Sequence, residues 1–169
     1  MNIDQSDRCI IERLIDAHQT KLLRLCYAYL HDWALAEDAV QETFFKAYKH
    51  LSSFRGESAE NTWLMRIAIN TCKDMRRMHW FRCIQPVPPE EVLNIKGNHA
   101  TMADVEITLE IMKLPVKLRE AVLLCWYKGM NYTEAAEVLG ISQQAVSSRM
   151  ERAKKKMQDV LKGSEDDEA

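Results

Sequence analysis

Hydrophobic residues recur along the first half of the chain at steps of three and four, the spacing that lines one face of an α-helix. Three such runs predict amphipathic helices over about residues 7–30, 33–51 and 63–81. No run alternates in the two-residue rhythm of a strand, so the first 82 residues are predicted to form a compact helical bundle. The positions that define the three faces are Ile11, Leu14, Ile15, His18, Leu22, Leu25, Tyr29, Trp33, Ala36, Val40, Phe44, Ala47, Leu51, Trp63, Leu64, Ile67, Ala68 and Thr71.

Helical spacing stops over residues 83–103. Pro86, Pro88 and Pro89 disfavour a helix, because proline lacks an amide donor and restrains the residue before it. Residues 95–99 form a second break. We therefore predict a linker between two domains at residues 83–103.

The second half of the chain is also predicted to be helical. Helical spacing resumes at about Ala103 and continues to Pro115, which suits the first turn of a further helix. That helix is expected to stop at Gly129, in the left-handed conformation that often ends helices. Asn131, followed by Glu134, resembles a capping box that opens the next helix.

Residues 132–151 fit a helix-turn-helix motif. Ala136 is small enough for two helices to cross there, and Gly140 adopts turn conformations that are costly for other residues. Ile141 and Val146 are spaced to fill the gap between the two helices. This combination predicts a DNA-binding motif, which on its own fits almost any bacterial repressor.

The last helix, which Ser142 is placed to cap, is rich in amides, hydroxyls and cations. Amides and hydroxyls near the start of such a helix suit base edges, and cations suit phosphates. The alternative is a helical hairpin with a solvated charged face, and the three consecutive lysines taken alone fit it equally well. The candidate DNA-facing residues are Gln143, Gln144, Ser147, Ser148, Arg149, Arg152, Lys154, Lys155 and Lys156.

Charge is unevenly distributed, although 23 basic and 25 acidic residues give a net charge of only −2. Residues 64–82 carry five basic residues and one acidic, and residues 142–162 carry six basic and two acidic. Residues 32–45 carry four acidic residues and none basic. The tail at residues 163–169, expected to be disordered, carries four acidic residues. Two basic regions and one acidic helix indicate more than one kind of partner.

Several other classes of protein are disfavoured. No apolar stretch approaches the roughly 18 residues of a membrane span, and the polar N-terminus is unlike a secretion signal, so we expect a cytoplasmic chain without membrane insertion. The five dispersed cysteines are expected to be reduced, and Cys26 and His31 do not share a helical face, so no metal site is expected. Without a phosphate-cradling glycine loop or a nucleophile elbow, we expect no catalytic residue, no cofactor and no enzymatic activity.

Three segments together resemble a known family: "EDAVQETFFKAY", then "SFRGESAENTWLMRIAINTCKD", and beyond the linker "LPVKLREAVLLCWYKGMNYTEAAEVLGISQQAVSSRMERAKKKM". In this order the chain resembles the extracytoplasmic-function (ECF) sigma factors, except in its first few residues, linker and tail. The resemblance implies an all-α fold of two small helical domains, the second containing the helix-turn-helix. It implies sigma domain two at residues 1–82, a linker at 83–103, sigma domain four at 104–162 and a disordered acidic tail at 163–169.

The function that the resemblance implies is promoter recognition by a subunit of RNA polymerase. Asp38, Gln41 and Glu42 match the segment that docks on the β′ clamp helices of core RNA polymerase. Taken alone, this acidic face also fits a solvated helix surface. The helix at about residues 115–128 would dock on the β flap, and an anti-sigma factor is a further partner that the family leads one to expect.

The first domain is also implied to bind the −10 element of promoter DNA. The loop at residues 54–61 matches one that captures an extruded base, and Asn70 matches a position lining that pocket. A base cannot be read on its pairing edge until it leaves the stack, so a preformed pocket offsets the cost. Trp63 fits the hydrophobic core equally well. The implied residues are Phe54, Arg55, Ala59, Asn61, Trp63, Arg66, Asn70, Lys73, Arg76 and Arg77, with the cations on phosphates.

The second domain is implied to read the −35 element through Gln143, Gln144, Ser147, Ser148, Arg149, Arg152 and Lys154. Ser147 departs from the family pattern, since many relatives carry a basic residue there. A stand-alone regulator with a helix-turn-helix and a sensor domain is the competing function. It would bind duplex DNA without polymerase, and it gives no purpose to the acidic helix or to the loop at residues 54–61.

Overall fold

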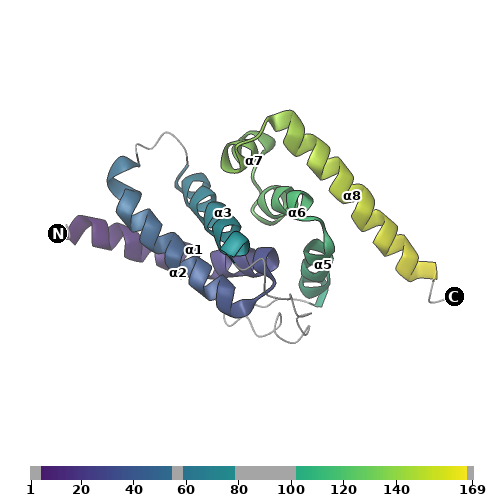
Figure 1. Ribbon diagram of the computed structural model, residues 1–169, viewed down its shortest axis with the longest axis horizontal. Coiled ribbons are helices and arrows are strands. Elements are labelled where there is room, and N and C mark those ends of the chain that lie inside the picture. Colours follow the sequence, from purple (N-terminus) through teal and green to yellow (C-terminus); the bar gives the residue numbers. More distant parts are fainter. Residues whose placement is uncertain (1–4, 55–58, 79–101, 167–169) are drawn as a thin grey trace. The chain divides into compact units, whose positions relative to one another are not determined.

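The computed structural model describes residues 5–54, 59–78 and 102–166 of the chain (Figure 1). All regular structure within these segments is helical, and the chain divides into two compact units, Met1–His99 and Ala100–Ala169. The predicted all-α fold with two small helical domains is therefore confirmed. No helix in the described segments combines the length and the apolar character that a bilayer crossing requires.

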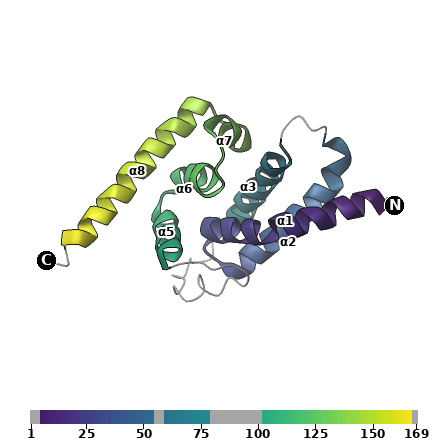
Figure 2. The same cartoon turned by 180° about the vertical axis from the view of Figure 1, so that it is seen from behind.

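The first unit is built from α1 (Gln5–Leu30), α2 (Trp33–His50), a short 3₁₀ turn η1 (Leu51–Ser53) and α3 (Glu60–Met78). The three long helices pack against one another, as both views of the ribbon show (Figures 1 and 2). These bounds lie within three residues of those predicted from the hydrophobic spacing, apart from residues 79–81, which lie outside the described segments.

The connection between α1 and α2 is set by local hydrogen bonds. His31 has a left-handed backbone (φ 61°), and its N–H donates to the Tyr27 carbonyl at 2.8 Å. Asp32 then caps α2, its carboxylate accepting from the Leu35 N–H at 2.9 Å. A tight turn with a side-chain cap makes α2 leave α1 at once, so that their apolar faces meet.

The core of the first unit contains buried side chains from all three helices. Three of the fully buried residues on α2 are alanines, whose small side chains allow close helix packing. The fully buried members are Leu14, Leu22, Leu25, Cys26 and Tyr27 on α1, Ala36, Ala39 and Ala47 on α2, and Leu64, Met65, Ala68, Ile69 and Cys72 on α3.

The second unit is built from α5 (Met102–Lys113), α6 (Val116–Val122), a π-helical turn η2 (Leu123–Tyr127), α7 (Tyr132–Leu139) and α8 (Gln143–Asp166). Helix α8 packs against both α6 and α7. The helix-turn-helix predicted at residues 132–151 is present as α7 followed by α8 (Figure 2).

A break before α6 is enforced by proline and by a buried arginine. Pro115 lies at the N-cap position, and its carbonyl accepts from the Leu118 and Arg119 amides at 2.9 Å each. The Arg119 guanidinium donates to the Met112 carbonyl at 2.8 Å and to the Leu114 carbonyl at 2.9 Å. These are backbone groups at the end of α5, which helix ends leave without partners in the helix itself. Arg119 therefore fixes the corner between α5 and α6.

The predicted capping residues of the helix-turn-helix are confirmed. Asn131 and Glu134 form a full capping box, with both hydrogen bonds at 2.9 Å. Gly140 is left-handed (φ 66°) and ends α7, and Ser142 Oγ accepts from the Ala145 N–H at 3.1 Å. Gly129 is left-handed as well, with φ 66°.

The ends of the second unit differ from the prediction. α5 begins at Met102, inside the predicted linker, whereas residues 79–101 lie outside the described segments. α8 continues to Asp166 and so includes residues 163–166 of the tail that was predicted to be disordered. Gly163 is a poor helix former, but its cost of about 1 kcal/mol does not by itself end a helix. Residues 167–169 lie outside the described part.

Candidate functional site

The polar surface of α2 carries the residues predicted to bind polymerase. Asp38 and Gln41 are exposed, and Glu42 is half-buried. The buried side of the same helix is apolar, with Ala39 and Phe44 in the core. The three polar residues therefore lie on one outward face of the first unit, which we call the acidic surface of α2.

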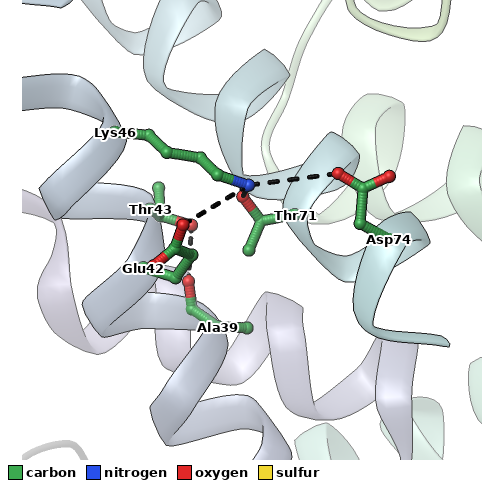
Figure 3. A network of polar contacts seen from close by, with 6 residues as sticks. All are labelled: Ala39, Glu42, Thr43, Lys46, Thr71 and Asp74. Carbon is green, nitrogen blue, oxygen red and sulfur yellow. Dashed lines mark hydrogen bonds and ion pairs between the residues drawn. The ribbon is translucent and has the colours of Figure 1, made fainter. Parts of the chain in front are cut away.

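Lys46 joins this surface to α3 (Figure 3). Its ammonium lies 3.7 Å from the Glu42 carboxylate and 4.0 Å from that of Asp74, and it donates to Thr71 Oγ1 at 3.3 Å. Glu42 is therefore not a free acid, because an ion pair on its own helix partly neutralises it. Asp38 and Gln41 are the better candidates for contacts with a partner.

Figure 3 also shows why α2 tolerates polar residues on its inner side. Thr43 is fully buried, and its hydroxyl donates to the Ala39 carbonyl at 2.6 Å. A buried hydroxyl with a hydrogen bond avoids the desolvation penalty of an unpaired one. α2 thus packs closely against its neighbours without an orphaned polar group at this position.

The start of α3 is held by an aromatic pair and an ion pair. The rings of Phe54 and Trp63 lie 4.7 Å apart between centroids, tilted by 34°, and both residues are half-buried. Arg13 on α1 forms two hydrogen bonds with Glu60, at 3.0 and 2.5 Å. The hydrogen bond from Arg13 lowers the pKa of the Glu60 carboxyl. Both ends of the loop at residues 54–61 are therefore anchored to the bundle.

The basic residues predicted to hold DNA lie mainly on one face of α3. Arg66, Asn70, Lys73 and Arg77 follow one another at steps of four, three and four. Asn70 and Arg77 are exposed and the other two are half-buried, whereas the opposite side carries the buried core. We call these four residues the basic face of α3.

The remaining predicted −10 residues surround the start and the end of the same helix. Ala59 is exposed, and its carbonyl accepts from the Trp63 N–H at 3.0 Å. Asn61 and Arg76 are half-buried. Arg55 lies outside the described residues.

The two buried cysteines of α1 and α3 are poorly suited to binding a metal ion. Cys26 and Cys72 are both fully buried, and the hydrogen bond between their side chains, with burial, raises the pKa of Cys72 well above its usual value. A thiol that stays protonated is a poor metal ligand. No group of three or more potential ligands occurs in the part of the chain that the structure describes.

The outer side of α8 carries most of the predicted −35 residues. Gln144, Ser148 and Arg152 follow one another at steps of four, and all three are exposed. Gln143 and Lys154 are exposed beside this row, and Ser147 is half-buried. The inner side packs on α6 and α7 through Val146, Met150, Ala153 and Met157.

Arg149 differs from the other predicted −35 residues. Its guanidinium lies 3.4 Å from the Glu120 carboxylate and 3.5 Å from the Lys117 carbonyl, both on α6. The Arg149 and Glu120 side chains are 19% and 7% exposed. This ion pair directs Arg149 toward α6, on the same side as Val146 and Ala153, rather than outward. The helical period would have indicated this, because position 149 is three residues after one buried residue and four before another.

The prediction missed Lys46, Glu120 and Phe45 as residues of these surfaces. Phe45 is 50% exposed on α2, and the Lys49 ammonium lies 4.2 Å from the centre of its ring. Its position four residues after Gln41 was a usable signal, since residues at this spacing share a helix face. The contacts of Lys46 to Thr71 and Asp74, and that of Glu120 to Arg149, join different helices and left no local signal.

Comparison with protein families matches both units. The Sigma-70 region 2 family matches residues 14–82, and the Sigma-70, region 4 family matches residues 104–157. The first match includes the acidic surface of α2 and the basic face of α3. The second includes the helix-turn-helix.

Similar proteins span almost the whole chain. The RNA polymerase sigma-H factor of Pseudomonas aeruginosa is 33% identical, and the aligned part covers 94% of this chain and 90% of that protein. The ECF RNA polymerase sigma-E factor of Haemophilus influenzae is 31% identical, with coverage of 94% and 91%.

Solved structures show the same fold. CnrH in complex with the cytosolic domain of CnrY has a TM-score of 0.71 at 28% identity, covering 92% of this chain and 90% of that one. The sigma factor RpoE from Bartonella quintana, in complex with the anti-sigma factor NepR, has a TM-score of 0.72 at 22% identity, with coverage of 89% and 96%. Matches to both sigma regions, in chains of similar length, leave one conclusion: this chain belongs to the extracytoplasmic-function sigma factors, the transcription initiation factors that recognise promoters.

Proposed function

We propose that this sigma factor divides its work among three surfaces. The acidic surface of α2 binds the β′ clamp helices of core RNA polymerase, the basic face of α3 binds the −10 element, and the outer side of α8 binds the −35 element. The observation that carries this proposal is the separation of charge, with one acidic helix surface and two basic ones in a chain that matches both sigma regions.

The acidic surface of α2 supports a protein partner. Phosphates repel carboxylates, so Asp38 favours a basic protein surface over DNA. Charge complementarity steers such an encounter, and a central aromatic residue often supplies much of the binding energy. Phe45, half-exposed beside Lys49, is suited to that second role.

The start of α3 supports binding of an opened strand. Phe54 and Trp63 form an aromatic pair next to the loop at residues 54–61, and aromatic side chains stack on bases. Arg66, Lys73 and Arg77 lie along one face, where they would hold successive phosphates, and the exposed amide of Asn70 would contact the flipped base.

The outer side of α8 supports duplex binding. Gln143, Gln144 and Ser148 lie in its first turns, where base edges of a major groove are reached, and Arg152 and Lys154 follow with charge for phosphates. Trp126 lies in the π-helical turn η2, which follows α6, and it is 54% exposed, which suits docking on the polymerase β flap.

A protein that holds the factor inactive is a second proposed partner. CnrH, at 28% identity, was solved in complex with the cytosolic domain of CnrY. We propose that this chain also binds an anti-sigma factor and works in the cytoplasm, where core polymerase is found. If a purified anti-sigma domain fails to displace the factor from core polymerase, that domain is not its regulator.

Charge reversal on α2 tests the main proposal. The variant Asp38→Lys with Gln41→Lys should weaken binding to core RNA polymerase at least about tenfold, because like charges across an interface cost several kcal/mol. The matched control is Asp16→Lys with Gln19→Lys, an exposed Asp–Gln pair at the same spacing on α1. Binding is measured by titrating labelled factor with core polymerase, and promoter-directed run-off transcription is measured in parallel.

The outcomes separate the candidate functions. If the α2 variant loses affinity for core polymerase and the α1 control does not, the result supports the proposed polymerase-binding surface. If both variants bind core polymerase equally well, the acidic surface of α2 is not the polymerase-binding surface. Specific binding of the free chain to a duplex, with no transcription in the presence of core polymerase, would favour the stand-alone regulator.

A further inference from the structure

Glu151 is an acidic residue on the basic, outward side of α8. It is exposed, and it lies three residues after Ser148 and directly before Arg152. With Gln144 and Lys155 these residues form a continuous stripe, at steps of four, three, one and three along the helix. The buried residues of α8 lie on the opposite side, so Glu151 belongs to the face that points away from the domain core.

No ion pair among the described residues accounts for Glu151. Lys155 follows it by four residues, the spacing at which glutamate and lysine pair best on a helix. Yet none of the ion pairs formed among the described residues includes Glu151, whereas Glu120 pairs with Arg149 and Glu42 with Lys46. Its carboxylate is available to a partner.

A carboxylate on a DNA-facing helix is unfavourable unless it meets a hydrogen-bond donor. The phosphate backbone is negative and repels it, which weakens binding to every sequence alike. In the major groove, the cytosine N4 amino group is a donor that carboxylates accept from, and it distinguishes cytosine from thymine. At that one position the repulsion is offset, and at other bases it is not.

We propose that Glu151 is a specificity-determining residue that accepts a hydrogen bond from the amino group of a cytosine in the upstream promoter element. This rests on the proposed function of α8 as the −35 reader. Arg149 pairs with Glu120 and lies outside this stripe. Gln144, Ser148 and Glu151 are therefore the members of the stripe proposed to face the bases, and Arg152 lies beside them with charge for a phosphate. Glu151 selects by rejecting bases that lack a donor as much as by binding the one that has it.

The test uses the full chain bound to core polymerase and a library of promoter duplexes randomised through the upstream element. Base preference is measured at each position for the natural protein, Glu151→Gln, Glu151→Ala and Glu137→Gln. Glu137 is an exposed acid on α7, so its variant has the same change in charge and serves as the control. Thermal unfolding by circular dichroism verifies that each variant is folded.

The natural protein and the control should favour cytosine at one position by about tenfold. Glu151→Gln should shift that position toward adenine, which glutamine recognises, and Glu151→Ala should abolish the preference there while other positions keep theirs. If both variants bind all sequences more tightly and retain the cytosine preference, Glu151 is a solvated charge and the proposal is wrong. If the natural protein has no preference anywhere in the upstream element, the assignment of α8 to that element fails as well.

Discussion

Arg149 and Arg152 are three residues apart on α8 and have opposite surroundings. Arg152 is exposed on the outer side, whereas Arg149 is directed at α6 and pairs with the carboxylate of Glu120, which is only 7% exposed. The residue type predicted DNA contact for both. Their positions on the helix differ in consequence: Arg149 stabilises the contact between α6 and α8, whereas Arg152 is available to DNA.

Replacing each arginine by alanine should therefore give different phenotypes. Arg149→Ala removes one partner of a buried carboxylate and should reduce the stability of the α6–α8 contact by about 1–2 kcal/mol. Arg152→Ala should change stability by less than about 0.5 kcal/mol and weaken binding to the upstream element. Amide hydrogen exchange of α6 and α8 in the full chain measures the first effect, and promoter binding measures the second.

Similar protection of α8 in the two variants would show that the Glu120 pair contributes little. In that case Arg149 could return to the set of DNA-contacting residues. Arg149→Lys is the companion variant, because it keeps the charge and loses the second contact to the Lys117 carbonyl.

At the scale of elements, the connection between α7 and α8 depends on one backbone conformation. Gly140 has φ 66°, and a Cβ atom built there would meet nothing within 4 Å. A side chain at this position is therefore opposed by backbone strain alone and not by a clash. The Ser142 cap follows two residues later, so the turn sets where α8 begins.

Gly140→Ala should lower the free energy of unfolding by about 1 kcal/mol, because alanine pays the left-handed penalty that glycine avoids. Gly140→Asn should cost less, since asparagine tolerates that conformation better. Urea unfolding followed by circular dichroism gives both values. Equal losses for alanine and asparagine would mean that the strain lies elsewhere in the turn.

At the scale of the whole molecule, two basic surfaces belong to separate compact units. The basic face of α3 lies in Met1–His99 and the outer side of α8 in Ala100–Ala169. Because the two surfaces share no residue, changes on them should act independently on DNA binding. The effect on DNA binding of changing both surfaces together therefore shows whether both units bind one promoter at the same time.

Salt dependence of promoter binding by the polymerase-bound factor measures this. Two double variants are compared, one that removes Lys73 and Arg77 on α3 and one that removes Arg152 and Lys154 on α8. Each should reduce the slope of log affinity against log salt by up to about two, because each phosphate contact contributes about 0.9. In a variant that lacks all four residues, the slope should fall by the sum of the two reductions. If the slope falls no further than it does for one pair alone, only one unit contacts the DNA in that complex.

The sequence by itself determined the features that depend on neighbours a few residues apart. The helices follow the spacing of apolar residues, and the caps at Asn131, Gly140 and Ser142 follow from hydrogen bonds and dihedral preferences within one turn. The charge of each surface is likewise present in the sequence, and so is the family resemblance that the comparisons confirmed.

The tertiary structure decided which charged side chains form contacts within the protein. Lys46 on α2 contacts Thr71 and Asp74 on α3, and Arg149 on α8 contacts Glu120 on α6. Lys46 and Thr71 are 25 positions apart in the sequence, and Arg149 and Glu120 are 29 apart, so no local pattern relates these partners. Such contacts exist only after the apolar faces have packed and set the distances between helices. For that reason Glu151, which packing leaves exposed and which forms no ion pair among the described residues, became a candidate for function only with the structure.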